Sequence, residues 1–145
     1  MLCVNNFTKH YVNKCRTKVG VQVSAYHALV GTVIKQAGAN KPNVSAAIEA
    51  FEPHFFDNLV LAVEGYFVHR SKAIEKKDGN PLNEVRMLSA SLMNNNGKMA
   101  TDETIKLDAA NSVVKYNIGD KIKLTEADFT RLSSAFFVEI ENKYL

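Results

Sequence analysis

The chain has 145 residues, of which 46% are hydrophobic and 23% charged, and its formal net charge is +3. This length and composition are typical of one globular domain spanning residues 1–145. The sequence contains neither an apolar run of about 18 residues, as a membrane span needs, nor the continuous apolar core of a signal peptide. We therefore expect a soluble protein of the cytoplasm that does not enter a membrane.

The charges are distributed unevenly along the chain. Residues 1–42 contain no acidic side chain, and the remaining residues have a net charge of −3. The basic residues of the first segment are Lys9, Lys14, Arg16, Lys18, Lys35 and Lys41. Such an asymmetry indicates either an anionic partner or a basic helix that packs on an acidic body.

The first predicted element is a helix over residues 6–37. Its apolar residues, from Phe7 to Ala37, recur at spacings of three and four, which places them on one helical stripe. A continuous helix of this length would measure about 48 Å, whereas a compact domain of this size is about 38 Å across. The helix must therefore either break, with Gly20 as the first candidate and Gly31 as the second, or overhang the domain and pair with another chain.

The next elements are a short helix over residues 44–51 and a central helix over residues 53–77. Asn43 is a suitable cap for the first of them, and Pro53 fits the first turn of the second. The middle of the second helix, residues 59–63, is apolar on every side. A helix with this pattern must be covered all round, so we place it at the centre of the fold.

The second half of the chain predicts two more helices with irregular or extended structure between them. Asn80 and Pro81 start one helix, and the capping-box pattern at Thr125 starts the other. The apolar period between them changes to two, which predicts a small β-hairpin or meander over about residues 104–124. The expected fold is therefore mainly α: a bundle of four to five helices around the helix 53–77, with a small β-hairpin before the last helix.

Polar residues of the central helix are the candidates for catalysis. His54, Asp57 and Glu64 fall on one narrow stripe, and His69 follows at the end of the helix. Asp57 and Glu64 are two helical turns, about 10 Å, apart, which is too far to bind one ion without residues from other helices. We therefore predict no metal site and no cofactor. The alternative is that the stripe is the solvent-facing seam of a mostly buried helix.

Two further groups of residues are candidates for binding anions. Tyr66, His69 and Arg70 lie at spacings of three and four and could together hold an anion, unless Arg70 pairs with an acid of the chain. Nucleic acid could bind the first helix weakly and without sequence preference. Its candidate contacts are Lys9, Lys14, Arg16 and Lys18.

The common signatures of nucleotide, hydrolase and metal chemistry are absent from the sequence. Our leading hypothesis is therefore a small, non-catalytic interaction or regulatory protein that acts as a homo-oligomer, most simply a dimer. The long apolar stripe of the first helix motivates it, and a different protein partner is a variant of it. The alternative is a helical-bundle enzyme or metal-binding protein that uses the central helix. A weak nucleic-acid binder is the third hypothesis.

Overall fold

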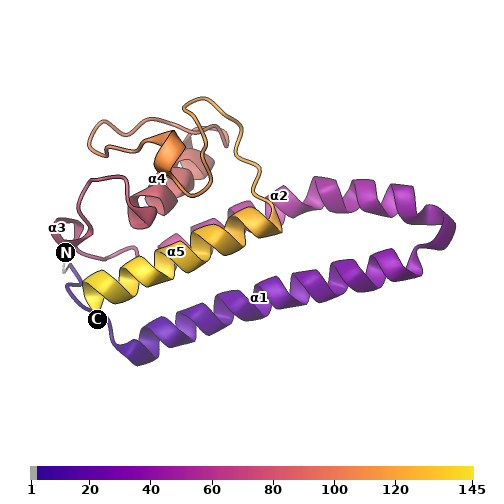
Figure 1. Cartoon of the computed structure of the whole chain (residues 1–145), viewed down its shortest axis with the longest axis horizontal. Helices are drawn as coiled ribbons and strands as arrows, with labels where there is room; N and C mark the ends of the chain where they lie inside the picture. The colour runs from indigo at the N-terminus through magenta and orange to yellow at the C-terminus, as the bar shows by residue number, and fades with distance from the viewer. Residues whose placement is uncertain (1–2) are drawn as a thin grey trace.

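A computed structural model describes residues 3–145, which fold into five α-helices joined by turns and by one long irregular segment, residues 95–125 (Figure 1). The helices are α1 (Lys9–Gln36), α2 (Lys41–Tyr66), α3 (Lys72–Glu75), α4 (Pro81–Asn94) and α5 (Glu126–Tyr144). Two short 3-10 helices are η1 (Gly38–Asn40) and η2 (Ala109–Asn111). The prediction of a mainly helical protein is confirmed.

Helix α1 is continuous through both of its glycines. The Thr8 hydroxyl caps it by accepting a hydrogen bond from the Tyr11 amide at 3.1 Å. A glycine costs about 1 kcal/mol in a helix interior, but Gly20 and Gly31 leave the helix unbroken over 28 residues. The predicted break is therefore wrong: α1 is one helix of about 42 Å. Its pairing with another chain stays a prediction.

Helix α2 corrects the predicted bounds of the central region. The expected helices 44–51 and 53–77 are a single helix that ends at Tyr66, with Pro53 in its interior. Proline removes one helical hydrogen bond, but the adjoining helical turns continue on both sides of it. The chain leaves the helix at Phe67, and Arg70 forms an isolated bridge with Val4 instead of continuing the helix.

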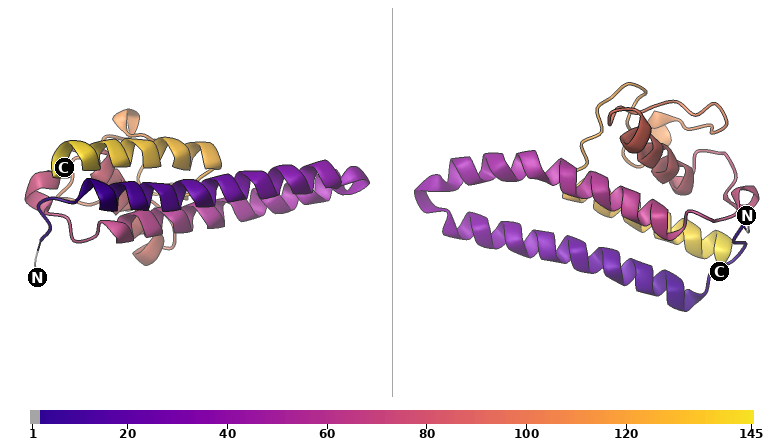
Figure 2. Two further views of the ribbon diagram at one scale, coloured as in Figure 1. Left: turned by 90° about the horizontal axis from the view of Figure 1, so that it is seen from below. Right: turned by 180° about the vertical axis from the view of Figure 1, so that it is seen from behind.

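Helices α1 and α2 form a long antiparallel hairpin that turns at Gly38, where the backbone has a φ of +55°. Helices α4 and α5 lie beside the half of this hairpin near the chain termini, while the other half projects beyond them (Figures 1 and 2). We call residues 24–36 and 41–55 the arm. Its base contacts the first residue of α5 through His27 and Glu52, and the rest of it projects beyond α5. Helix α2 contacts α1, α4 and α5, so it takes part in the core through its second half.

The main core lies between α1, α2, α4 and α5. Its aromatic members include Phe56, Phe67, Phe129, Phe136 and Tyr144, each at most 1% exposed. The predicted starts of α4 and α5 are confirmed. Asn80 accepts hydrogen bonds from the amides of the first turn of α4, and Thr125 and Asp128 form the capping box of α5.

The predicted β-hairpin over residues 104–124 is wrong. Residues 3–145 contain no strand, and the only bridge in this region pairs Lys98 with Lys121. Individual apolar side chains of the segment, such as those of Ile122 and Leu124, pack onto the helices. Side-chain carboxylates accept several of its amide hydrogens, so a neighbouring strand is not needed to satisfy them.

Three contacts fix this irregular segment to the helices. The carboxylate of Glu84 in α4 accepts hydrogen bonds from the Val113 and Val114 amides at 2.8 and 2.9 Å. Asp57 in α2 accepts one from the Leu124 amide at 3.2 Å. Gly79, whose φ is +76°, lies so close to the Lys106 carbonyl that a Cβ atom would be 2.4 Å from its oxygen. The approach of the segment to the α3–α4 turn therefore requires glycine at this position.

Candidate functional site

The structure places the four catalytic candidates of the central region in different surroundings. His54 and His69 are exposed, Asp57 is half-buried against the irregular segment, and Glu64 is buried in the core. Asp57 and His54 are electrostatic neighbours one turn apart. Within residues 3–145, no group of three or more His, Cys, Asp or Glu side chains could hold a metal ion.

Glu64 belongs to a buried ion network that the sequence did not predict. Arg70 is within 3.0 Å of the Glu64 carboxylate and 3.2 Å of the Glu75 carboxylate. Arg86 contacts the same two acids, at 2.5 Å from Glu75 and 3.6 Å from Glu64. Two acids and two arginines thus share one site without net charge.

The geometry of this network suits structural support. Arg70 is 2% exposed and also donates to the Phe67 and Leu82 carbonyls, so one side chain joins the end of α2 to α4. Burial raises the pKa of Glu64, although Arg70 and Arg86 act in the opposite direction. The predicted anion cluster therefore does not form: Arg70 is turned inward to these acids, whereas the adjacent His69 is exposed.

Asp57 gives a pH-dependent prediction. Burial raises its pKa to about 6, despite the opposing effects of the Leu124 amide, His54 and Lys121. Because the folded pKa lies above the unfolded value, the contribution of Asp57 to stability is fully present below pH 4 and is lost as the pH rises through about 6.

We expect Asp57→Asn to raise the free energy of unfolding by about 1 kcal/mol at pH 8, a value reduced to account for solvent screening of a half-buried group. The substitution should have little effect at pH 3.5–4, where wild-type Asp57 is largely protonated in both states. Urea unfolding at the two pH values measures the difference. Glu49→Gln, an exposed change on the same helix, is the control, and an equal gain for both variants would contradict the assignment.

The nucleic-acid candidates on α1 do not form one surface. Helical geometry places Lys14 and Lys18 on one side and Lys9 and Arg16 on another. Arg16 forms an ion pair with Glu141 of α5, and the Lys18 ammonium lies 5.9 Å from the centre of the Tyr66 ring. Two of the four cations are therefore already engaged within the chain.

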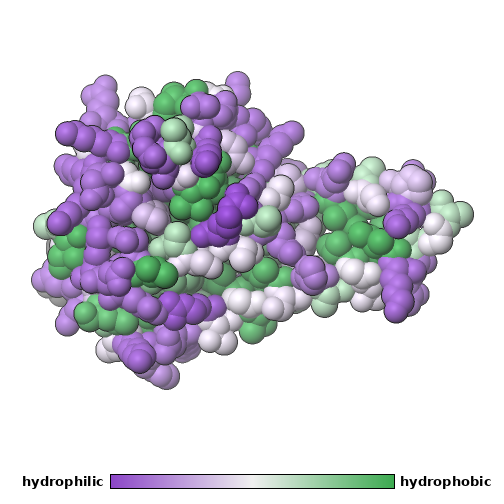
Figure 3. Space-filling view, viewed as in Figure 1, coloured by the Kyte–Doolittle hydropathy of each residue, from purple (hydrophilic) through white to green (hydrophobic). Residues whose placement is uncertain are grey.

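The most prominent exposed feature is an apolar surface on one side of the arm. Its centre is a groove of about 290 Å³ between α1 and α2, lined only by apolar and aromatic residues. We call this surface the hairpin face. Figure 3 views the molecule from the side on which α5 lies, and it shows that apolar side chains also gather on that opposite side of the projecting part. The residues that line the groove are Tyr26, Leu29, Val30, Val33, Val44, Ala47, Ile48 and Phe51.

The hairpin face continues toward the body of the protein. A second groove of about 230 Å³ shares Phe51 with the first and extends along the helices to Ala62. His54 and Asn58 lie at this second groove, so His54 is placed beside the hairpin face and away from the buried ion network. The two grooves form one surface along the α1–α2 seam.

The exposure and the charge of this surface do not fit a solvated helix pair. Leu29, Phe51 and Val33 are 61%, 50% and 38% exposed. Residues 19–34 of α1 contain no Asp, Glu, Lys or Arg, although most of them are exposed. A helix face in contact with water normally carries charged side chains. The arm therefore has the composition of a buried surface and not that of a solvated one.

The total surface area supports the same conclusion. The chain exposes 8611 Å² at a mass of 16.1 kDa, whereas a compact monomer of this mass exposes about 7400 Å². The excess of about 1200 Å² is larger than the roughly 800 Å² that each partner buries in a protein interface of standard size.

Sequence reasoning identified only the α1 half of the hairpin face. The contribution of α2 was missed because residues 44–51 were assigned to a separate short helix. The absence of charged residues between Lys18 and Lys35 is the signal that could have located the surface.

The chain matches no protein-family model, no curated protein and no solved structure. Among residues 3–145, no helix is both long enough and apolar enough to cross a membrane.

Proposed function

We propose that the protein is a non-catalytic assembly module that forms a homodimer through the hairpin face. The observation that carries the proposal is the exposed, uncharged and apolar surface of an arm that no other part of residues 3–145 covers on this side. Burying apolar surface is the main driving force of association, at about 25 cal/mol per Å².

A second copy is the partner that best fits the chemistry of this face. In a symmetric dimer a patch meets the same patch of the other copy, so charges of one sign gathered on it would face one another. Because residues 19–34 carry no formal charge, two hairpin faces can approach without such repulsion. Two paired helices from each copy would then form a four-helix arrangement with the apolar side chains inside.

The other two hypotheses have less support. His54, Asp57, Glu64 and His69 do not line a common pocket, and the two acids have structural contacts. A nucleic-acid backbone would meet only part of the basic charge of α1, since Arg16 is paired with Glu141.

Light scattering coupled to gel filtration tests the proposal directly. We expect the wild-type protein to elute with twice the 16.1 kDa monomer mass. Leu29→Glu should weaken the dimer by at least about a hundredfold, because it places a carboxylate in an apolar interface. Leu29 is already 61% exposed, so the variant monomer should fold normally.

Val138→Glu on α5 is the matched control, since Val138 is also an exposed aliphatic residue, at 52%, but lies outside the hairpin face. It should leave the dimer intact. A wild-type protein that stays at monomer mass at high concentration would overturn the proposal. A dimer that both substitutions weaken equally would move the interface away from the hairpin face.

A further inference from the structure

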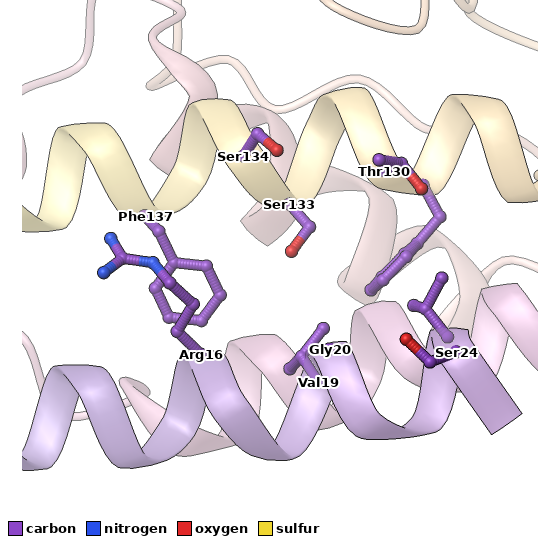
Figure 4. Close-up of a pocket in the computed structure, with 10 residues that line it drawn as sticks. Arg16, Val19, Gly20, Ser24, Thr130, Ser133, Ser134 and Phe137 are labelled. Atoms are coloured by element: carbon purple, nitrogen blue, oxygen red, sulfur yellow. The ribbon is translucent and has the colours of Figure 1, made fainter.

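A third hollow lies between α1 and α5, where an ion pair and a histidine–carboxylate contact bridge the helices at its ends. At one end Arg16 pairs with Glu141, and at the other His27 Nδ1 lies 3.0 Å from Glu126 Oε2. Between these pairs α1 runs for about 16 Å. We call the space between them the α1–α5 slot; Figure 4 shows it from the side, with α5 above α1.

The slot has an apolar floor and a rim of small hydroxyl side chains. Its volume is about 280 Å³, close to the lower limit for small-molecule sites. Phe129, Phe137 and Val19 are buried at its floor, with Val23 half-buried beside them. The rim is formed by Ser24, Thr130, Ser133 and Ser134.

The slot exists because the residues along its rim are too small to close it. A Cβ atom added at Gly20 would meet nothing within 4 Å, so the space above this residue is open. Figure 4 shows the Ser133 side chain extending from α5 toward Val19 and Gly20 without reaching α1. Buried aromatic rings keep the two helices apart while short side chains leave the space between them unfilled.

We propose that the α1–α5 slot binds a straight-chain monocarboxylic acid, with its alkyl chain on the apolar floor and its carboxylate at Arg16. Of the ten described residues that line the slot, Arg16 alone carries a formal charge, and Glu141 beside it offsets that charge. The polar end of a ligand must therefore be a group that accepts hydrogen bonds from the remaining N–H donors of Arg16. The rest of the ligand must be apolar, because it lies against Phe129, Phe137 and the two valines.

Arg16 retains the capacity to bind such a carboxylate. Its guanidinium lies over the Phe137 ring, 5.1 Å from the centroid, which places it at the end of the apolar floor. It donates one hydrogen bond to Asn13 and one to Glu141, while a guanidinium has five N–H donors. Hydrogen bonds from arginine to carboxylates are among the stronger ones in proteins.

This site does not depend on the proposed dimer. The helical period places Gly20 and Ser24 on the side of α1 opposite Gln22 and Leu29, which belong to the hairpin face. The slot therefore stays open to a ligand whether the protein is a monomer or a dimer joined through the arm.

Calorimetric titration of the full-length protein with octanoate tests the proposal, with octanol and octylammonium as ligands of the same chain length. We expect saturable binding of octanoate at a stoichiometry of one per chain, and binding at least about tenfold weaker for octanol and octylammonium. Arg16→Gln should weaken octanoate by about the same factor. It should leave the weak octanol binding unchanged.

Two glycines of α1 provide a matched pair of variants for locating the ligand. Gly20→Leu fills the slot, whereas Gly31→Leu places the same side chain on the same helix outside it, and neither Cβ meets another atom within 4 Å. Both changes increase helix propensity, so both variants should fold. Octanoate binding should be lost in Gly20→Leu and retained in Gly31→Leu.

Each contrary result would overturn the proposal. The absence of saturable octanoate binding up to about 10 mM would exclude a useful site. Equal binding of octanoate and octylammonium would exclude the carboxylate assignment. Binding that survives Gly20→Leu would place the ligand elsewhere on the protein.

Discussion

Replacing Arg70 by Met is expected to lower the free energy of unfolding by about 3–5 kcal/mol, because it leaves buried acids without their main counter-ion. Arg70 is the largest fully buried side chain, and it contacts Glu64, Glu75 and two backbone carbonyls. Methionine fills part of the volume, but it cannot donate a hydrogen bond to any of these oxygens. The remaining Arg86, whose side chain is 21% exposed, would have to pair with both carboxylates from the edge of the site.

The loss of unfolding free energy in Arg70→Met should depend on pH. This dependence separates the effect of charge from a simple packing defect. Without Arg70, burial and repulsion by Glu75 should raise the pKa of Glu64 in the folded state further. A raised folded pKa stabilises the protein at low pH, and this contribution is lost as the pH rises. We therefore expect a larger difference between variant and wild type at pH 8 than at pH 5, measured by denaturant unfolding.

Arg131→Met is the control for this experiment. Arg131 pairs with Asp128 at 2.8 Å on the surface, with 56% of its side chain exposed. An exposed pair of this kind contributes between zero and about 1 kcal/mol. Similar losses for Arg70→Met and Arg131→Met would show that the buried network does not hold the end of α2 against α4.

Local signals in the sequence predict the helices that the structure confirms. The starts of α4 and α5 follow from capping patterns only a few residues long, at Asn80 and Thr125, and these caps make the expected hydrogen bonds. The break at Pro53 was wrong because a helix packed into a core can tolerate one missing hydrogen bond. Propensity at a single residue therefore decides less than the contacts of the whole helix.

The irregular segment could not be predicted from its alternating pattern. An alternation of apolar and polar residues indicates that every second side chain is buried. A strand also needs a neighbouring strand whose carbonyls accept hydrogen bonds from its amides. Here the acceptors are the carboxylates of Glu84 and Asp57, which are 29 to 67 residues away along the chain. A pairing at such a distance leaves no trace in the local period.

The buried ion network was missed for a similar reason. Glu64, Arg70, Glu75 and Arg86 lie in three helices and a turn, and only the fold brings them together. The α1 half of the hairpin face, in contrast, could be predicted from the sequence, since the apolar stripe of α1 is longer than the domain is wide. Its α2 half became clear only when residues 41–66 proved to be one helix.

The second large effect is expected at Glu84, where Glu84→Ala should lower the free energy of unfolding by about 3 kcal/mol. Glu84 is 1% exposed, and its two carboxylate oxygens accept the Val113 and Val114 amides. Alanine would leave two half-buried amides without an acceptor, at a cost of about 1–3 kcal/mol each, and would remove packing from α4. Water that reaches the two amides should offset part of this cost. We therefore expect a loss of unfolding free energy in the lower half of the range obtained by adding the costs of the two amides.

The structure also predicts which amides should exchange faster in Glu84→Ala. The contact joins α4 to the irregular segment, so hydrogen exchange of the Val113 and Val114 amides should accelerate before that of the α1, α2 and α5 amides. Glu103→Ala, an exposed change within the same segment, should alter neither stability nor exchange. Uniformly faster exchange in all helices would instead mean that Glu84 supports the whole core. Unchanged exchange at Val113 and Val114 would exclude Glu84 as the anchor of the segment.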